Sequence, residues 1–234
     1  MPSIETILSP ALIPYHNLQH RTAVIIDVLR ATTSICYALS EGALSMIPVS
    51  NPVDCLMYRN EGYLCAGERN GIKLEGFDMG NSPEEFQSAT VAGKKIAITT
   101  TNGTHAILES KEADRIYIGS FSNLKALAKR LMAEGNDVTL VCAGWKNRVN
   151  LEDTLFAGAL ASALEGFTSE CDSTLMAKNL WDLSKEHLQD HVEQSSHAQR
   201  FIKLGVDDMR DCLNLNQCDN IPEYLNGEIV NTVV

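Results

Sequence analysis

The chain has 234 residues, of which 44% are hydrophobic and 21% are charged, and this composition favours a folded protein with a sizeable core over a disordered one. The formal net charge of -11 disfavours nucleic acid and anionic membrane as partners, because most of the surface would repel them. An anionic metabolite would be repelled too unless a few arginines focus positive potential in one cleft. Arginines close to a motif are therefore the residues of interest.

The cysteines and the N-terminal segment indicate the compartment. Cys36 and Cys142 lie in apolar runs, and the seven cysteines form no C-x-x-C pair and no zinc-type spacing with histidine, so we expect buried thiols in a reducing environment. The first 14 residues lack the basic and apolar segments of a secretory signal, and no run approaches the ~20 apolar residues of a membrane helix. A cytoplasmic location is the expectation.

Short β-branched runs alternate with helical patterns over the first two thirds of the chain. In chain order the predicted elements are strand 23–27, helix 32–41, strand 44–49, short helix 52–58, strand 63–66, strand 95–99, helix from about 104, strand 115–118, helix 122–134, strand 137–142 and helix 151–167. Continuous apolar strands separated by helices are typical of an α/β protein whose mainly parallel sheet is covered on both faces.

The pattern changes after residue 168. Residues 169–211 are polar, helical in pattern and poor in strands, and Glu228 to Val230 suggests one last edge strand. No linker or repeat separates the parts. We therefore expect a single domain over 1–234, with a motif-bearing core at about 20–168 and a helical C-terminal part at about 169–234 packed on it.

The first candidate loop directly follows the predicted strand 23–27. In open α/β sheets ligands bind at the carboxyl ends of strands. Here Asp27 could hold Mg²⁺, Arg30 could clamp phosphate, and the backbone amides of residues 32–34 could cradle oxyanions. Helix capping would explain one of the three hydroxyl residues, but not Asp27 and Arg30.

Two more loops follow predicted strands. The segment 99–105 carries four hydroxyls and an Asn-Gly before a helix, which is typical either of an anion-binding nest or of a capped turn. The segment 142–153 ends with Glu152 and Asp153 in the first turn of a helix. Acids favour helix N-termini in any case, so this pair is either a cap or a pair of carboxylates facing a metal.

A glycine-rich polar stretch over 66–83 lies between these loops in the sequence. Its charged and amide residues Glu68, Arg69, Asp78 and Asn81 could reach a ligand, although an ordinary surface loop would have the same composition. Neither a Walker-type G-x-x-x-x-G-K-[ST] nor a G-x-S-x-G elbow is present, which disfavours the corresponding nucleotide-binding and hydrolase sites.

These loops together resemble the 2-phosphosulfolactate phosphatase family. The matching strings are VIIDVLRATTS (24–34), AGERNGIKLEGFDMGNSP (66–83), ITTTNGTHAI (98–107), IGSFSN (118–123) and LVCAGWKNRVNLEDTLFAGAL (140–160), with a looser likeness around Ser195-Ser196-His197, Asp208, Cys212 and Ile221-Pro222. The resemblance implies a three-layer α/β/α sandwich with a mainly parallel or mixed central sheet. It also implies Mg²⁺-dependent hydrolysis of 2-phospho-3-sulfolactate to 3-sulfolactate and phosphate, a step of coenzyme M biosynthesis.

The resemblance carries a set of site residues onto this sequence, and their individual roles are our inference. The predicted catalytic residues are Asp27, Glu68 and Asp153, and the predicted metal ligands are Asp27, Asp78 and Glu152. The predicted substrate- and phosphate-binding residues are Arg30, Thr32, Thr33, Arg69, Asn81, Thr100, Asn102, Gly103, Thr104, Cys142 and Gly144. The expected cofactor is Mg²⁺, and the expected partners are a small anionic phosphorylated metabolite and a second copy of the chain in a homodimer.

Two departures from the family pattern bear on the substrate. After Cys142-Ala143-Gly144 the family usually continues with small residues and glycine, whereas this chain has Trp145-Lys146-Asn147-Arg148. The tail also carries Asp211 and Asn216 where relatives look more apolar or acidic. If these positions contact substrate, the protein could prefer a different 2-phospho acid.

Two further readings stay open. Cys142-x5-Arg148 has the spacing of cysteine phosphatases, although no Ser or Thr follows the arginine and no His precedes the cysteine. The same pocket could also serve a non-catalytic protein that binds an anionic metabolite.

Overall fold

Strand β2 (Thr22–Ile26) lies in the interior of the sheet, between β8 and β7, as its apolar run predicts. All four residues from Ala23 to Ile26 are fully buried. Successive side chains of a strand point to opposite faces. Accordingly Val24 and Ile26 enter one hydrophobic cluster, whereas Ala23 and Ile25 enter another on the opposite face.

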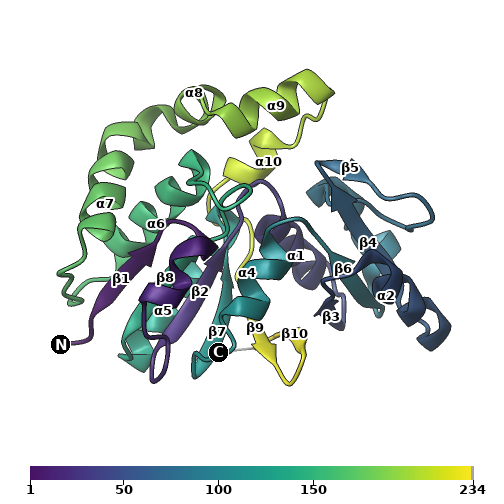
Figure 1. Ribbon diagram of the computed structural model, residues 1–234, viewed down its shortest axis with the longest axis horizontal. Helices are drawn as coiled ribbons and strands as arrows, with labels where there is room; N and C mark the ends of the chain where they lie inside the picture. The colour runs from purple at the N-terminus through teal and green to yellow at the C-terminus, as the bar shows by residue number, and fades with distance from the viewer. Residues whose placement is uncertain (233–234) are drawn as a thin grey trace.

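The computed structural model describes residues 1–232 (Figure 1). Its strands are β1 (Ile4–Ile7), β2, β3 (Ser45–Pro48), β4 (Leu64–Arg69), β5 (Ile72–Lys73), β6 (Lys95–Thr99), β7 (Arg115–Gly119), β8 (Val138–Cys142), β9 (Pro222–Leu225) and β10 (Glu228–Asn231). Its α-helices are α1 (Ala31–Ser40), α2 (Pro52–Met57), α3 (Ser88–Val91), α4 (Gly103–Glu109), α5 (Leu124–Glu134), α6 (Leu151–Ala163), α7 (Asp172–Ser184), α8 (Leu188–Glu193), α9 (Ser196–Leu204) and α10 (Met209–Leu213). Each predicted strand and helix of the first two thirds is present, with its ends shifted by a few residues.

The ten strands form one mixed sheet in the order β1-β8-β2-β7-β9-β10-β3-β6-β4-β5. The first four strands of this order are mutually parallel, and so are β3, β6 and β4. Helices cover both faces. Helices α5, α6 and α7 share one hydrophobic cluster, and α1 and α4 share the other. The expected three-layer α/β/α class is confirmed.

The prediction of a C-terminal edge strand is wrong. Strands β9 and β10 form an antiparallel hairpin in the interior of the sheet, between β7 and β3. The hairpin joins the two parallel blocks through the pairs Tyr117↔Glu223 and Ile229↔Met46. The 15-residue tail 220–234 gives no local sign of this position, since the position depends on partners more than 100 residues away.

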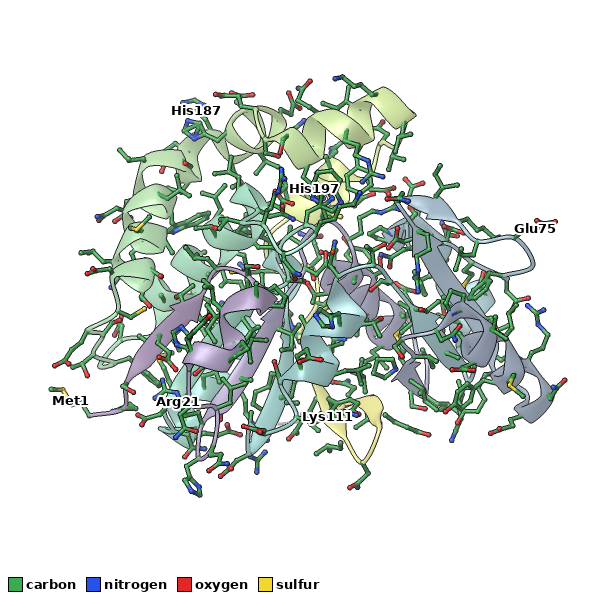
Figure 2. The ribbon with its side chains drawn as sticks, viewed as in Figure 1. Met1, Arg21, Glu75, Lys111, His187 and His197 are labelled. Atoms are coloured by element: carbon green, nitrogen blue, oxygen red, sulfur yellow. The ribbon has the colours of Figure 1, made fainter. Side chains whose placement is uncertain are left out.

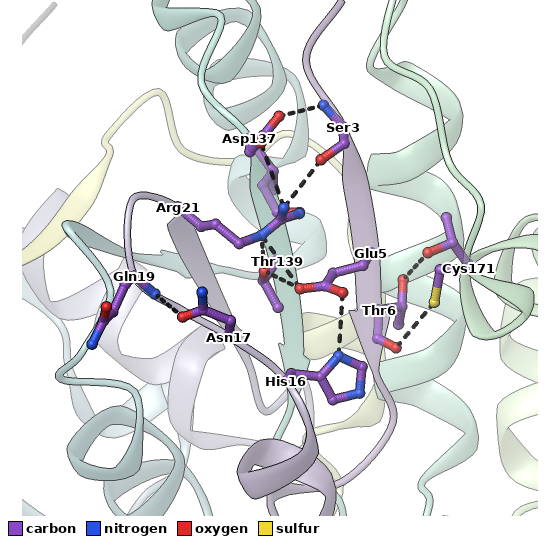
Figure 3. A network of polar contacts seen from close by, with 12 residues as sticks. Ser3, Glu5, Thr6, His16, Asn17, Gln19, Arg21, Asp137, Thr139 and Cys171 are labelled. Carbon is purple, nitrogen blue, oxygen red and sulfur yellow. Dashed lines mark hydrogen bonds and ion pairs between the residues drawn. The ribbon is translucent and has the colours of Figure 1, made fainter.

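The sequence reasoning also missed strand β1, which pairs with β8 at the other edge of the sheet. Arg21 fixes this edge: its guanidinium donates to Thr139 Oγ1 (2.7 Å), to the Val138 carbonyl (2.7 Å) and to Ser3 Oγ (3.0 Å) (Figure 3). Ser3 directly precedes β1, and Val138 and Thr139 belong to β8, so Arg21 ties the two strands together.

The segment predicted to be helical after residue 168 folds as helices α7 to α10. Helices α8, α9 and α10 lie at the top of the molecule, across the ends of the strands (Figure 1). No helix of residues 1–232 combines the length and the apolar character needed to cross a membrane. The C-terminal helices thus bring residues 195–213 over the strand ends where the candidate loops lie.

Candidate active site

Loops from both parallel blocks of the sheet meet at one pocket, which helix α9 covers. Its enclosed free space is about 20 Å³, close to the volume of one water molecule. The pocket is lined by Asp27, Leu29, Arg30, Glu68, Asn70, Gly71, Asn81, Thr101, Asn102, Trp145, His197, Arg200 and Phe201. Among the predicted site residues, Asp27, Arg30, Glu68, Asn81 and Asn102 therefore converge on one cavity.

Asp27 directly follows β2 and is almost completely buried. The N-terminus of α4 packs against it: a Cβ at Gly103 would lie 2.8 Å from Asp27 Oδ2 and 2.5 Å from Ala31 Cβ, so only glycine fits. Burial raises the pKa of Asp27 to about 7, with Glu68 and Glu152 adding to the increase and His197 opposing it. The ionised carboxylate is therefore destabilised until a cation approaches it.

Arg30 is held rigidly at the rim of the pocket. Its Nη1 donates to Asp208 Oδ2, its Nη2 donates to the Gly71 carbonyl (3.0 Å), and the guanidinium lies 5.0 Å from the centre of the Phe201 ring. Asp208 also accepts a hydrogen bond from Ser82 (2.6 Å), so the C-terminal helices and the glycine-rich segment fix Arg30 together. The Nε atom of Arg30 is buried without a partner.

Glu68 links two loops of the pocket. Its Oε1 accepts a hydrogen bond from the Thr101 N–H (2.8 Å), and its Oε2 accepts one from the Gly71 N–H (2.6 Å). Both carboxylate oxygens therefore already accept backbone hydrogen bonds. This geometry favours a positioning role for Glu68 over the predicted role as a base.

Buried polar atoms without partners gather at this pocket. Three lining residues have such an atom: Arg30 Nε, Asn81 Oδ1 and Thr101 Oγ1. Glu152 Oε2, behind His197, is a fourth. Because buried polar groups are normally hydrogen-bonded, a cluster of unpartnered donors and acceptors indicates a site for a polar ligand.

His197 is the main site residue without a predicted role. Its Nδ1 lies 2.6 Å from Glu152 Oε1 and 3.2 Å from Asn150 Nδ2, and its ring lies between Trp145 (centroids 5.9 Å apart) and Phe201 (4.8 Å). With Nδ1 engaged, Nε2 is the ring nitrogen that remains for other partners. Figure 2 shows His197, a residue of α9, on the inner side of the C-terminal helices, whereas His187 lies at the outer edge.

The signal for His197 was present in the string Ser195-Ser196-His197, which belongs to the looser part of the resemblance. Ser195 caps helix α9, since its side chain accepts a hydrogen bond from the Ala198 N–H (3.0 Å). The string therefore also fits an ordinary helix start. Only its placement above β2 and Glu152 distinguishes the two interpretations.

The predicted hydroxyl residues build the loops instead of lining the pocket. Thr32 Oγ1 accepts a hydrogen bond from the Asp27 N–H (3.0 Å), and Thr33 Oγ1 donates to the Val28 carbonyl (2.9 Å). Thr100 and Thr104 cap each other, each side chain accepting from the other's backbone N–H at 3.0 Å. These bonds hold the turns after β2 and β6 in shape.

Several predicted residues lie outside the lining of the pocket. Asp78 pairs with Arg59 (2.9 Å) and accepts a hydrogen bond from the Cys65 N–H (2.8 Å). Arg69 donates to Thr99 Oγ1 (2.9 Å) and lines a separate groove beside α4. The geometry thus does not support Asp78 as a metal ligand or Arg69 as a clamp in this pocket.

Asp153 is completely buried and supports the loops from below. Its Oδ1 accepts a hydrogen bond from the Val28 N–H (2.9 Å), and its Oδ2 accepts one from the Gly144 N–H (2.9 Å). Gly144 has φ of 58°, and a Cβ there would lie 2.2 Å from the Arg148 carbonyl oxygen. Asp153 and Gly144 therefore set the shape of the β2 and β8 loops, and the predicted role of Asp153 as a base finds no support in this geometry.

Cys142 is buried inside β8 and is not part of the pocket lining. Burial raises the pKa of its thiol well above the ordinary value, with Asp153 and Glu152 adding to the increase, so a reactive thiolate is disfavoured. If the chain has the phosphatase activity that the resemblance implies, we expect Cys142→Ala to keep it within about threefold of the wild type, because removing a buried thiol affects packing and not the pocket. Wild-type activity that survives EDTA, together with abolished turnover in a folded Cys142→Ala protein, would instead favour the cysteine mechanism.

Comparison with known proteins identifies the same family over nearly the whole chain. The family model described as 2-phosphosulpholactate phosphatase matches residues 7–227. A protein of Thermotoga petrophila named "Probable 2-phosphosulfolactate phosphatase" is 40% identical over 219 residues, which cover 93% of this chain and 95% of that protein. A protein of Symbiobacterium thermophilum with the same name is 37% identical over 225 residues, covering 93% and 97%.

Proposed function

The chain belongs to the 2-phosphosulpholactate phosphatase family, and from this membership we propose that it is a Mg²⁺-dependent phosphatase that hydrolyses 2-phospho-3-sulfolactate to 3-sulfolactate and phosphate. The observation that carries the proposal is the convergence of Asp27, Arg30, Glu68 and Asn102 on one pocket at the strand ends. Had these side chains lain on separate faces, the family likeness alone would not support catalysis.

Magnesium fits this pocket through separate oxygen donors. Among residues 1–232, no three His, Cys, Asp or Glu side chains form a cluster that would hold an ion by themselves. Mg²⁺ is usually held by one or two carboxylates together with substrate phosphate oxygens and water. Asp27 and the unpartnered Asn81 Oδ1 supply such donors. When bound, the ion would polarise the phosphoryl group and offset the negative charge of the substrate.

Arg30 is the residue best placed to hold the phosphoryl group. Its two terminal nitrogens are fixed by Asp208 and by the Gly71 carbonyl, which leaves the buried Nε–H without a partner. A phosphate oxygen would supply that partner, and hydrogen bonds to charged groups are stronger than those between neutral groups. A guanidinium held in advance also loses little side-chain entropy when the substrate binds.

His197 is suited to transfer the proton. When water attacks phosphorus and the P–O ester bond breaks, the departing alkoxide oxygen of the hydroxy acid needs a proton. We assign its delivery to His197 Nε2, with Glu152 holding Nδ1 and stabilising the imidazolium form. Glu68, in the same pocket, is less suited to this transfer because its carboxylate already accepts two backbone hydrogen bonds. Glu152 as a metal ligand stays a prediction.

Phosphate release measures the proposed function directly. Purified protein is incubated with 2-phospho-3-sulfolactate and, for comparison, with other 2-phospho acids, with Mg²⁺ and with EDTA. We expect release with Mg²⁺ and its loss with EDTA. Preference for another 2-phospho acid would change the substrate assignment, and tight binding without turnover would favour the metabolite-binding alternative.

A further inference from the structure

The loop after β8 places an aromatic wall beside the pocket. Trp145 and Arg148 close a tight turn through two backbone hydrogen bonds of 2.9 and 3.0 Å. Lys146 and Asn147, at the centre of this turn, have φ values of 51° and 59°, as in a type I′ turn. The turn is the segment that departs from the family pattern, and it directs Trp145 to the pocket lining.

Two cationic side chains lie against the ring of Trp145. The Arg200 guanidinium is 5.1 Å from the ring centre, and Lys146 Nζ is 4.9 Å from it. Arg200 comes from α9, one helical turn after His197, and itself lines the pocket. Its Nη2 donates to the carbonyl of Asn70, on the far side of the pocket, so Arg200 spans the cavity.

The charge of Arg200 is not neutralised by a neighbouring acid. Among the ion pairs of residues 1–232, Arg30 is paired with Asp208, whereas neither Arg200 nor Lys146 has a carboxylate within 4.0 Å. Positive charge without a protein counter-ion therefore lies at the outer wall of a pocket whose inner wall holds Asp27 and Glu68. In a chain of net charge -11 such a site is the place where an anion finds a favourable potential.

We propose that Arg200, supported by the face of Trp145, binds the sulfonate of the substrate. It thereby makes this chain selective for phosphate esters in which the carbon adjacent to the phosphate-bearing carbon carries a sulfonate. The proposal rests on the proposed function. The guanidinium has five N–H donors, and the bond to Asn70 uses one of them. Arginine is also the more weakly hydrated cation and stacks on aromatic faces. It therefore suits a sulfonate, which spreads its charge over three oxygens and follows an apolar CH₂ group.

The test compares kcat/KM for two esters that differ in the sulfonate. The substrates are 2-phospho-3-sulfolactate and 2-phospholactate, and the variants are Arg200→Gln and Arg200→Lys. Arg200→Gln should lower kcat/KM for the sulfonate ester about 10- to 100-fold, the loss of a hydrogen bond between charged groups, and should change that for 2-phospholactate less than threefold. Arg200→Lys should recover part of the loss. The matched control is Lys203→Gln, a cation of the same helix outside the pocket lining.

Three results would overturn the proposal. The first is an unchanged ratio of the two kcat/KM values in Arg200→Gln. The second is an equal loss with both esters, which would indicate a role in phosphate binding or in folding. The third is a loss of kcat/KM that depends on the carboxylate of the substrate and not on its sulfonate. Arg200→Gln would then hydrolyse 2-sulfoethyl phosphate, which has no carboxylate, as fast as the wild type, but 2-phospholactate more slowly.

A binding measurement separates this inference from the proposed function. If the wild type hydrolyses none of these esters, the proposed function fails, and calorimetry with 3-sulfolactate and with lactate still tests the sulfonate site. Wild-type protein should then bind 3-sulfolactate more tightly than lactate, and Arg200→Gln should remove the difference. Equal binding of the two acids by the wild type would overturn the inference.

Discussion

Replacement of Asp27 by asparagine should reduce phosphate release at least about 10³-fold while the protein stays folded. Asp27 ends β2, lines the pocket and is the carboxylate against which α4 packs. Asparagine keeps the shape but removes the charge that would hold a divalent cation, and each ~1.4 kcal/mol lost from the transition state costs tenfold in rate. The measurement is turnover with saturating Mg²⁺, beside circular dichroism of the same sample.

Asp78→Asn is the matched control for this variant. Asp78 was also a predicted metal ligand, but it pairs with Arg59 outside the pocket, and its side chain is 38% exposed. Turnover of Asp78→Asn should stay within about threefold of the wild type. A folded Asp27→Asn protein with wild-type turnover would remove Asp27 from the catalytic site. An equally large loss in Asp78→Asn would show that Asp78 belongs to the active site.

The same substitution should stabilise the metal-free protein at neutral and higher pH. The pKa of Asp27 rises from the ordinary 3.8 to about 7 on folding, chiefly through burial, so the folded state binds the proton more tightly than the unfolded state does. The contribution of this group to stability is therefore complete below pH 3.8 and declines as pH rises to about 7, by about 4 kcal/mol in total.

Asparagine resembles the protonated side chain and does not titrate. In EDTA, Asp27→Asn and the wild type should unfold at similar temperatures near pH 4, and the variant should be the more stable above pH 7. Thermal unfolding from pH 4 to pH 8 tests this, with Asp78→Asn as the comparison. A constant difference between Asp27→Asn and the wild type across this range would contradict a raised pKa for Asp27.

Replacement of His197 by glutamine should lower kcat about 10²- to 10⁴-fold with little change in KM. That range is typical of losing a general acid. The reason is the geometry: Nδ1 is bound by Glu152 at 2.6 Å, and the ring lines the pocket with Nε2 left to serve the leaving oxygen. With p-nitrophenyl phosphate as substrate the loss should be much smaller, because p-nitrophenolate departs without needing a proton.

The control for this prediction is His187→Gln, whose side chain is 76% exposed at the outer edge of the molecule (Figure 2). It should leave kcat unchanged with both substrates. Equal losses with both substrates in His197→Gln would indicate that the residue supports the packing of Trp145 and Phe201 and does not transfer the proton.

The sequence by itself determined most of the secondary structure and the inner part of the site. Strand β2 and the residues Asp27 and Arg30 are predictable because an apolar run with a charged end specifies its own local structure. The strand ends of a mostly parallel sheet share an edge, so Asp27, Glu68 and Asn102 could be expected to meet there. Predicting that these residues lie close together therefore required only the fold class, and no detail of the packing.

The tertiary structure alone decided which carboxylates face the pocket and which hold its walls. Glu68, Asp78 and Asp153 look alike in the sequence. The fold ties Glu68 and Asp153 to two backbone amides each, whereas Asp78 is tied to Arg59 and to one backbone amide, that of Cys65. Hydrogen-bond partners of this kind lie up to 125 residues apart along the chain, so no local pattern indicates them.

The same limit explains the C-terminal third of the chain. The polar pattern of residues 169–211 predicts solvent-exposed helices, yet this segment contains His197, Arg200 and Asp208. The pattern of the tail predicts an edge strand, yet the tail forms the β9–β10 hairpin inside the sheet. Their positions follow from long-range pairing and packing onto strands formed much earlier in the chain. Sequence periodicity reports which face of an element is apolar, but the partner that covers that face is chosen by the packing of the whole domain.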